Sequence, residues 1–228
     1  MKPSSNYYIN IHSHRKPILD NEFTIRNAFH FLERKDLDQL NYAVSVGIHP
    51  WHVAKSDLEK SMKRLERCLQ SSKVLAIGEC GLDRSIAISI DLQRSYFATQ
   101  FELAQRYRKP IIIHSVRSYY DFVPYLKASN VPFIFHRFQG NAQELAQLMK
   151  HKAYFSFGKS LIQNHAVQIE LFKKIPLNRL FLETDNTNVS IDQVYEKAAD
   201  LRNIESGEVK LLVFNNFATV FEERANEY

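Results

Sequence analysis

Short apolar segments recur along the chain, and stretches with helical periodicity separate most of them. The segments are rich in β-branched and aromatic residues, which predicts β-strands at 7–11, 23–28, 42–46, 74–78, 111–113, 133–135, 154–157 and 179–182. The segment 111–113 is three isoleucines in a row, which is typical of a strand covered on both faces of a parallel sheet.

Between these segments, apolar residues return with the spacing of an amphipathic helix. Leu58, Met62, Leu65 and Leu69 predict a helix over 58–69, and similar patterns predict helices at 93–107, 142–149 and 191–201. A strand followed by a helix, repeated along the chain, predicts an α/β fold of the compact (β/α)8 TIM barrel type. The main rival is a doubly wound open sheet, but no Gly-x-Gly-x-x-Gly or Walker loop follows the first strand.

The composition is that of one globular domain. With 228 residues, 45% hydrophobic and 24% charged, the chain is long enough to bury a core without disulfides or metals. No linker rich in Pro, Ser or Gly divides it, so we expect a single domain over 1–228. Its two cysteines, Cys68 and Cys80, form neither a disulfide framework nor a Cys-x-x-Cys motif.

Targeting and charge signals are weak. No apolar run approaches the ~20 residues of a membrane span, and the first residues lack the apolar core of an export signal. We therefore expect a cytoplasmic protein with no membrane association and no obligate protein partner. The net charge of +5 is compatible with a phosphate-bearing partner. An excess of this size more often contributes only to solubility.

Side chains with metal-binding chemistry follow the predicted strands. A parallel barrel places its site at the C-terminal ends of its strands. His12 and His14 follow the first strand, and the alternation of side chains along a strand puts both on one face. The later strand ends supply His49, Glu79 with Asp83, His114, His136 and Asp185. Each alone has a simpler explanation: a strand-end histidine is often only a polar end, and Asp185 could cap a helix.

Together, four histidines and two carboxylates at one rim predict a metal centre. Imidazole and carboxylate ligands suit Zn²⁺, Mn²⁺ or a similar ion, and the absence of cysteine among these candidate ligands argues against a structural zinc. Six ligands are too many for one catalytic ion with open positions, and they suit two ions about 3.5–4 Å apart, bridged by a carboxylate and activating a water. The six are His12, His14, Glu79, His114, His136 and Asp185.

Several phrases of the sequence also occur together in a known family. They are Ile11-His12-Ser13-His14, Gly47-Ile48-His49-Pro50, Ile77-Gly78-Glu79-Cys80-Gly81-Leu82-Asp83, Pro110-Ile111-Ile112-Ile113-His114, His136 with Phe138 and Gly140, and Glu183-Thr184-Asp185. In this order they resemble the TatD family of metal-dependent deoxyribonucleases, which are barrel members of the amidohydrolase-like superfamily. The resemblance covers nearly the whole chain.

The resemblance implies a role for each site residue. His12, His14 and Asp185 would hold one divalent ion, His114 and His136 the other, and Glu79 would bridge them. The ions would be Mg²⁺, Mn²⁺ or Zn²⁺, and the reaction would be hydrolysis of DNA phosphodiester bonds. Asp185 and Glu79 would be the catalytic carboxylates, with Asp185 orienting or deprotonating the attacking water. His49 would lie beside the metals and face the substrate phosphate. Arg84, Arg117 and Arg137 would neutralise that phosphate, unless they are only solvated rim side chains.

The chain departs from the family pattern at the rim. Ser13 and Arg15 stand where the family more often has Cys and an apolar residue, and His136-Arg137-Phe138-Gln139-Gly140 replaces the commoner His-Cys-Phe-Ser-Gly. After Asp185 a short Asn186-Thr187-Asn188 segment replaces Ala-Pro and a longer loop. Rim loops decide substrate choice, so these changes leave the ligands intact and the substrate open.

Three functions therefore remain open. The first is a deoxyribonuclease, the second is the same metal site acting on an amide or ester, and the third is a non-catalytic protein that binds nucleic acid or metal. Glu79 stands where many amidohydrolases use a carboxylated lysine as the bridge, which favours the nuclease. The complete ligand set argues against a binding protein that has lost its activity.

Overall fold

Eight parallel strands form one sheet that curls into a barrel. The computed structural model describes residues 3–28 and 37–221. Each strand pairs in parallel with the next one along the chain, from β1 with β2 to β7 with β8. The (β/α)8 architecture expected from the sequence is confirmed. The strands are β1 (Tyr8–Ser13), β2 (Glu22–Asn27), β3 (Ala43–Val46), β4 (Val74–Asp83), β5 (Ile111–Val116), β6 (Phe133–Phe135), β7 (Ala153–Phe157) and β8 (Leu180–Leu182).

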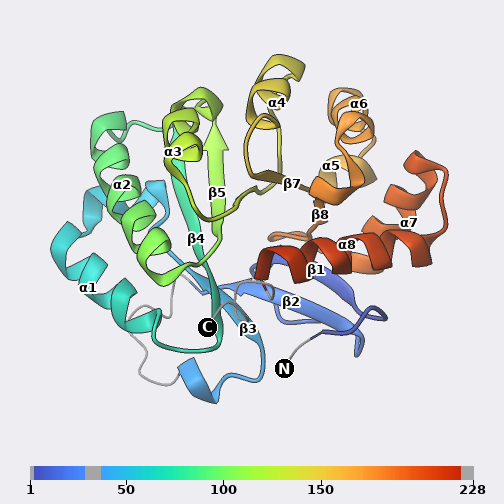
Figure 1. The fold of residues 1–228 in the computed structure, drawn as a ribbon, viewed down its shortest axis with the longest axis horizontal. Helices are drawn as coiled ribbons and strands as arrows, with labels where there is room; N and C mark the ends of the chain where they lie inside the picture. Colours follow the sequence, from blue (N-terminus) through green and yellow to red (C-terminus); the bar gives the residue numbers. More distant parts are fainter. Residues whose placement is uncertain (1–2, 29–36, 222–228) are drawn as a thin grey trace.

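The helices lie around the outside of the barrel (Figure 1). Of the four predicted helices, all are present, as α1, α2, α4 and α7. Among the helices described, none combines the length and the apolar character that a membrane span requires. The α-helices are α1 (Leu58–Cys68), α2 (Ile90–Tyr107), α3 (Val123–Ala128), α4 (Ala142–Leu148), α5 (Lys159–Ile162), α6 (Ala166–Lys174), α7 (Ile191–Arg202) and α8 (Ser206–Phe221).

The alternation of strand and helix is incomplete near the N-terminus. Residues 14–21 join β1 to β2 without a helix, which differs from the regular repeat expected. A buried carboxylate organises this connection instead. Glu22 accepts hydrogen bonds from the backbone N–H of Ile18 (2.9 Å) and from the side chains of Asn10 (2.8 Å) and Thr24 (2.7 Å). These bonds fix the loop against β1 and β2, so the direction of β2 does not depend on a packed helix.

The strands β4 and β5 run past their predicted ends. The polar residues after 78 and 113 indicated loops, but the backbone ladder continues and pairs Cys80 with Ile113 and Asp83 with Val116. Glu79 and His114 therefore project from hydrogen-bonded strands. Side chains on strands are held more rigidly than side chains on loops, which favours a preformed site.

Phenylalanines on β6, on β7 and in the segment after β6 pack against one another in the core. The rings of Phe135 and Phe155 stack with centroids 5.9 Å apart, and Phe138 packs edge-on against Phe155 at 4.9 Å. All three are fully buried. Because Phe135 and Phe138 flank His136 and Arg137 in the sequence, this packing fixes the two polar residues at the rim.

The barrel closes between its first and last strands with few backbone hydrogen bonds. Among the described residues, the bridge from β1 to β8 is a single pairing of Ser13 with Asp185. Side chains replace the missing ladder: the hydroxyl of Tyr195 on α7 bonds both the N–H (3.0 Å) and the C=O (2.9 Å) of Ile9. The side-chain oxygen of Asn10 accepts from the N–H of Thr184 at 3.1 Å. We call this junction the β1–β8 seam; α7 and α8 cover it.

Candidate metal centre

A bulge in β4 presents Glu79 to the interior of the barrel rim. Between the pairs Ile77–Ile111 and Cys80–Ile113, β4 uses one residue more than β5. Gly78 and Gly81 flank the bulge with positive φ angles of 147° and 149°. A Cβ on Gly78 would lie 2.6 Å from the carbonyl oxygen of Ile112. The two glycines thus let β4 pass close to β5 while Glu79 turns inward.

The two oxygens of Glu79 face different histidines. Oε2 lies 3.4 Å from Nε2 of His12 and 3.8 Å from Nε2 of His14. Oε1 lies 2.8 Å from Nδ1 of His114, 2.8 Å from Nε2 of His136 and 3.1 Å from Nε2 of His49. A single buried carboxylate therefore lies at the centre of five imidazoles.

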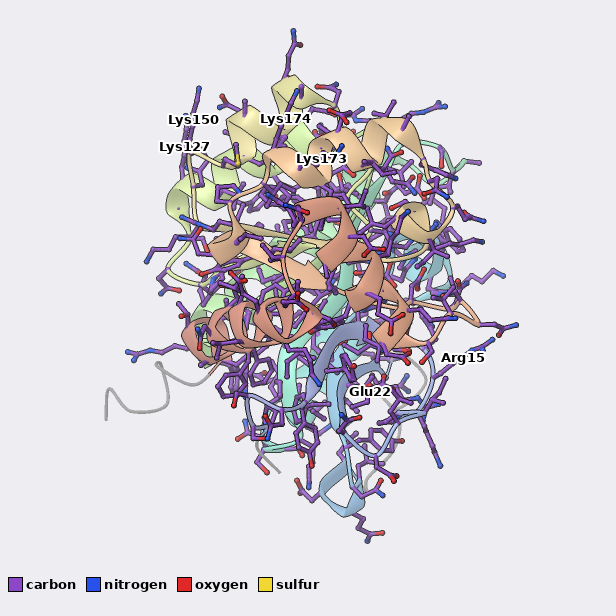
Figure 2. The ribbon with its side chains drawn as sticks, turned by 90° about the vertical axis from the view of Figure 1, so that its right-hand side faces the viewer. Arg15, Glu22, Lys127, Lys150, Lys173 and Lys174 are labelled. Carbon is purple, nitrogen blue, oxygen red and sulfur yellow. The ribbon has the colours of Figure 1, made fainter. Side chains whose placement is uncertain are left out.

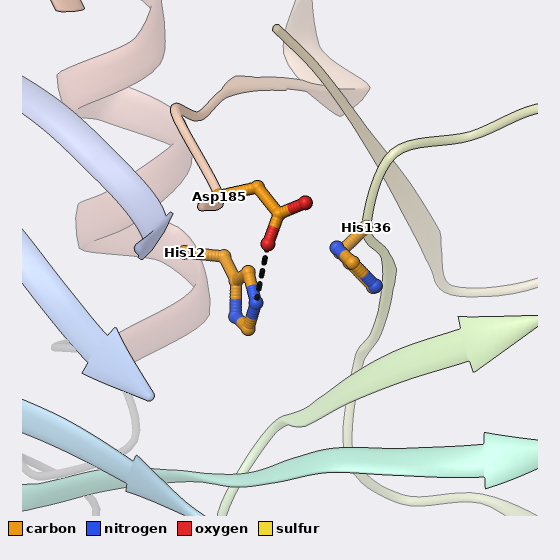
Figure 3. Close-up of side chains that lie close together, drawn as sticks. All are labelled: His12, His136 and Asp185. Atoms are coloured by element: carbon orange, nitrogen blue, oxygen red, sulfur yellow. Dashed lines mark ion pairs between the residues drawn. The ribbon is translucent and has the colours of Figure 1, made fainter. Parts of the chain in front are cut away.

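Asp185 completes the cluster from the end of β8. Its Oδ1 lies 3.7 Å from Nε2 of His12 and 3.4 Å from Nε2 of His14. Figure 3 shows His12, His136 and Asp185 converging on one space, and the rings of His12 and His136 lie 4.5 Å apart. The backbone of Asp185 is tied to β1, since its N–H donates to the carbonyl of His12 at 3.0 Å and its carbonyl accepts from the N–H of His14 at 2.9 Å.

His12 has the clearest geometry of a metal ligand. The residue is fully buried, and neither ring nitrogen has a hydrogen-bond partner in the described part of the chain. A buried polar group without a partner is costly, so it calls for a ligand. Two donor atoms that each lie about 2.1 Å from the same tetrahedral ion are about 3.4 Å apart. The distances from Nε2 of His12 to Glu79 and Asp185, 3.4 and 3.7 Å, are close to that value.

The donor set also carries enough negative charge for divalent cations. Four carboxylates are buried at this rim, namely Glu79, Asp83, Glu183 and Asp185. Among the described residues, three groups of side chains could each hold an ion, because the donor atoms within each group lie within 4.8 Å of one another. The groups are His12 with His136 and Asp185, His12 with His14 and Glu79, and His49 with Glu79 and His114. The residues fit a centre of oxygen and imidazole ligands.

The carboxylates and imidazoles shift one another's pKa values. Burial raises the pKa of Glu79, but the charge of His136 and the hydrogen bond from His114 outweigh burial and leave this pKa well below its usual range. Burial lowers the pKa of His136, and the carboxylates of Glu79 and Glu183 raise it well above its usual range. Hydrogen bonds to Asp185 and Glu79 raise the pKa of His14 to about 9. Glu79 therefore stays ionised and attracts positive charge.

The pKa of His49 shifts in the opposite direction to the pKa values of His14, His114 and His136, which are raised. Burial lowers its pKa, so the ring is neutral at pH 7. Nδ1 accepts a hydrogen bond from the backbone N–H of Trp51 (3.2 Å), which puts the ring proton on Nε2, where it faces Oε1 of Glu79 at 3.1 Å. The resemblance implied that His49 lies beside the metals and faces the substrate phosphate, and the second part stays a prediction. In the structure His49 contacts the central carboxylate.

Several contributing residues were not assigned a role from the sequence. Asp83 lies 3.2 Å from Nε2 of His114 and accepts from the indole N–H of Trp51 at 2.7 Å. Asn27 donates to Oε2 of Glu79 at 3.2 Å. Glu183 lies 3.4 Å from Nδ1 of His136. Asn27 and Asp83 are the last residues of β2 and β4; the strand-end rule named Asp83 without giving it a role, and it could also have identified Asn27.

The three rim arginines lie in different surroundings. Arg137 donates to Oδ2 of Asp185 at 2.8 Å. Arg84 forms a two-pronged ion pair with Asp121, which also binds Arg94. Arg84 and Arg117 line a neighbouring hollow with Tyr120, and not the pocket over Glu79. Of the three, only Arg137 is in place to contact a molecule at the metal centre.

A pocket of about 480 Å³ opens above the cluster. Of the lysines and arginines described, only Arg137 lines it. Other positive charges complement helix dipoles elsewhere: Lys127 and Lys173 lie in the last turns of α3 and α6. Figure 2 shows these lysines with Lys150 and Lys174 at one end of the molecule, away from Arg15, which follows His14. The net charge of +5 is therefore a poor guide to the charge at the pocket.

Comparison with known proteins identifies the family of this chain. Residues 19–222 match the family described as TatD related DNase. The chain belongs to this TatD family. The resemblance seen in the sequence phrases is thereby confirmed, and the match includes every candidate ligand except His12 and His14, which precede residue 19.

Individual TatD relatives match over most of the chain. The uncharacterized metal-dependent hydrolase YabD of Bacillus subtilis (strain 168) is 32% identical over 217 residues, which cover 87% of this chain and 83% of YabD. The 3'-5' ssDNA/RNA exonuclease TatD of Edwardsiella piscicida is 31% identical over 165 residues, covering 70% of this chain and 63% of that protein. The crystal structure of the TatD homolog YJJV from Escherichia coli K12 has the same fold, with a TM-score of 0.83 at 23% identity over 96% of this chain and 99% of that one.

Proposed function

We propose that this protein is a divalent-metal-dependent hydrolase that cleaves phosphodiester bonds of DNA. One observation carries the proposal. In a chain of the TatD family, a fully buried histidine without a hydrogen-bond partner, His12, faces two ionised carboxylates beneath an open pocket. Several curated relatives bear nuclease names, among them a deoxyribonuclease of Schizosaccharomyces pombe and the ssDNA/RNA exonucleases of Edwardsiella piscicida and Erwinia tasmaniensis.

The centre is proposed to hold two divalent ions, of Zn²⁺, Mg²⁺ or Mn²⁺. Support comes from Glu79, because each of its oxygens faces a different set of imidazoles. A carboxylate that bridges two ions needs such an arrangement. The proposed ligands are His12, His14 and Asp185 on one side and His114 with His136 on the other. When bound, such ions lower the pKa of a water and stabilise the charge that develops on the phosphate oxygens.

Asp185 is proposed to position the attacking water. Burial alone would raise the pKa of this carboxyl, but His14, His12, His136 and Arg137 lower it, so the group stays ionised. An ionised carboxylate accepts a hydrogen bond from water and so directs a lone pair of the water oxygen toward the phosphorus. Its carbonyl and N–H are tied to β1, which holds the side chain over the pocket floor.

Arg137 is proposed to bind a non-bridging phosphate oxygen. Its guanidinium has five N–H donors, and only one is needed for the bond to Asp185. The side chain is 45% exposed and lines the pocket, so the other donors are open to a substrate. The proposed role of His49 is to keep Oε1 of Glu79 in place through the Nε2 proton, since this ring is neutral and faces that oxygen.

The test is a substrate panel with the purified protein. Single-stranded DNA, duplex DNA, RNA, and acyl ester and amide compounds are incubated with and without EDTA, and the protein is analysed for metal. We expect chelator-sensitive release of nucleotides from DNA. Turnover of only the acyl compounds would replace the proposal by an amidohydrolase-like activity, and binding of DNA without any turnover would replace it by a non-catalytic role.

A further inference from the structure

Trp51 is exposed at the rim of the metal-centre pocket. It lies in the short helix Pro50–Lys55 that follows β3 and His49, and 55% of the residue is accessible to solvent. An indole is among the largest apolar groups a protein can bury, yet this one remains in water beside the candidate ligands. It is also the only tryptophan in the chain.

Two hydrogen bonds hold this indole in one orientation. The ring N–H donates to Oδ2 of the buried Asp83 at 2.7 Å, and the backbone N–H donates to Nδ1 of His49 at 3.2 Å. The rings of His49 and His114 lie at 83° and 77° to the indole plane. No aromatic ring of the described residues therefore stacks in parallel on the indole.

A fixed, exposed indole face is suited to stacking with a planar aromatic group. Each stacked nucleobase in single-stranded binding sites contributes about 1–3 kcal/mol, and every base has the required face. Because the bond to Asp83 already fixes the ring, binding would cost little side-chain entropy. The pocket volume of about 480 Å³ lies within the range typical of sites for small ligands.

We propose that Trp51 is the stacking platform for a nucleobase next to the phosphate bound at the metal centre. The inference rests on the proposed function, since it assigns one further contact to the same substrate. It also gives Asp83 a role: this carboxylate holds the indole through one oxygen and faces Nε2 of His114 with the same atom at 3.2 Å. The base platform and the metal centre thus share a common support.

The single tryptophan allows a direct binding test. The protein as purified is titrated with a short oligothymidylate whose phosphorothioate backbone resists hydrolysis, and with an abasic oligomer of the same length and backbone. Both carry the same charges, so only the bases differ. Binding is followed by the anisotropy of a label on the oligomer and, separately, by tryptophan fluorescence. We expect oligothymidylate to quench Trp51 and to bind more tightly than the abasic oligomer, which should leave the fluorescence nearly unchanged.

Two substitutions separate stacking from support of the fold. Trp51→Phe keeps an aromatic face and loses the bond to Asp83, whereas Trp51→Leu loses both. We expect Trp51→Leu to weaken oligothymidylate binding at least about 5-fold, the lower end of the contribution of one stacked base, and to leave abasic binding unchanged. Trp51→Phe should retain most of the affinity. Tyr120→Leu is the matched control, because Tyr120 is 54% exposed in the neighbouring hollow.

Other outcomes would contradict the stacking role of Trp51, the proposed function, or both. Equal binding of the two oligomers to the wild-type protein, with DNA still hydrolysed, would refute the stacking role and leave the proposed function in place. Equal losses in Trp51→Phe and Trp51→Leu would mean that the indole only positions Asp83. A loss in Tyr120→Leu alone would move the platform to the hollow beside Arg84 and Arg117. If no oligomer binds and no DNA is cleaved, both proposals fail.

Discussion

The guanidinium of Arg137 donates a hydrogen bond across 2.8 Å to Oδ2 of Asp185, while Oδ1 of the same carboxylate faces His12 and His14. One carboxylate therefore joins the candidate ligands to a candidate phosphate-binding residue. Arg137 comes from the segment after β6 and Asp185 from the segment after β8, so this contact also links two separate edges of the rim.

Replacing Arg137 should impair both the binding of the substrate phosphate and the positioning of Asp185. We expect Arg137→Ala to lower kcat/KM on DNA about 10- to 100-fold, the size of one or two charge-assisted hydrogen bonds. Arg137→Lys should recover part of the loss, because a lysine supplies charge without the planar fork. Steady-state kinetics on a DNA oligomer measure the effect. Lys173→Ala removes an equal charge from a residue that does not line the pocket, and it should change kcat/KM less than about 2-fold.

Substitution of the central carboxylate should abolish most of the turnover. Glu79→Gln keeps the size of the side chain but replaces the carboxylate by an amide with one oxygen and one NH₂ group. An amide cannot supply an anionic oxygen to each of the two proposed ions. We expect kcat to fall at least ~10³-fold, which corresponds to ~4 kcal/mol of transition-state stabilisation, with a smaller change in KM. Metal content should fall in parallel.

The neighbouring residue supplies the control for Glu79. Cys80 is fully buried in the hydrophobic core and has no part in the cluster, so Cys80→Ala should retain kcat, with a modest loss of stability. A Glu79→Gln protein with near-normal kcat and two bound ions would show that the bridge lies elsewhere, at Asp83 or Glu183.

Chelation should stop the reaction and leave the barrel folded. The apolar residues of eight strands and their surrounding helices form one continuous core, and no part of it depends on the candidate ligands. We therefore expect EDTA to abolish hydrolysis while the far-UV circular dichroism spectrum stays unchanged. Cooperative loss of the spectrum on metal removal would contradict this and make the ions structural.

Salt should weaken substrate binding only gently. Arg137 is the one lysine or arginine of the described residues that lines the pocket, so few phosphate charges are neutralised there. We expect log KM for single-stranded DNA to rise with log salt concentration with a slope of about 1 to 2. Measurements between low and moderate ionic strength decide it. A slope of zero would favour a small neutral substrate.

The β1–β8 seam should be a weak point for stability. Tyr195→Phe removes the hydroxyl that bonds both backbone groups of Ile9 and leaves them buried without partners. We expect the free energy of unfolding to fall by about 1–3 kcal/mol, measured by urea denaturation. Tyr120→Phe, which removes an exposed hydroxyl, should change it by less than about 0.5 kcal/mol.

The sequence predicts the barrel and the ligand types well, because both depend on local patterns. Apolar segments mark strands, and a polar residue after such a segment marks the rim, which is how Glu79 and His114 were found. The strand ends were set too early at 78 and 113, since hydrophobicity does not reveal a backbone ladder that continues through polar residues. The rule also passed over Asn27, because β2 is partly polar and its end is poorly marked.

The partners of the rim arginines could not be predicted from the sequence. Arg84 and Arg137 have the same chemistry and both follow strands. One pairs with Asp121 on the segment after β5, and the other with Asp185 after β8. These pairings depend on the register and direction of loops that are far apart in the sequence. Trp51 is a similar case: its sequence position suggests a turn, and only the structure reveals the bond to Asp83.

The seam has a consequence for the protein during its synthesis. A nascent chain that has left the ribosome only as far as β7 already contains His12, His14, Glu79, His114 and His136, but it has neither Asp185 nor the strand that pairs with Ser13. Closing the barrel and completing the proposed ligand set therefore depend on the same segment, β8 and the residues that directly follow it. With Asp185 as a proposed ligand, a chain that stops before residue 185 lacks part of the centre, so we expect hydrolysis only from chains translated past β8.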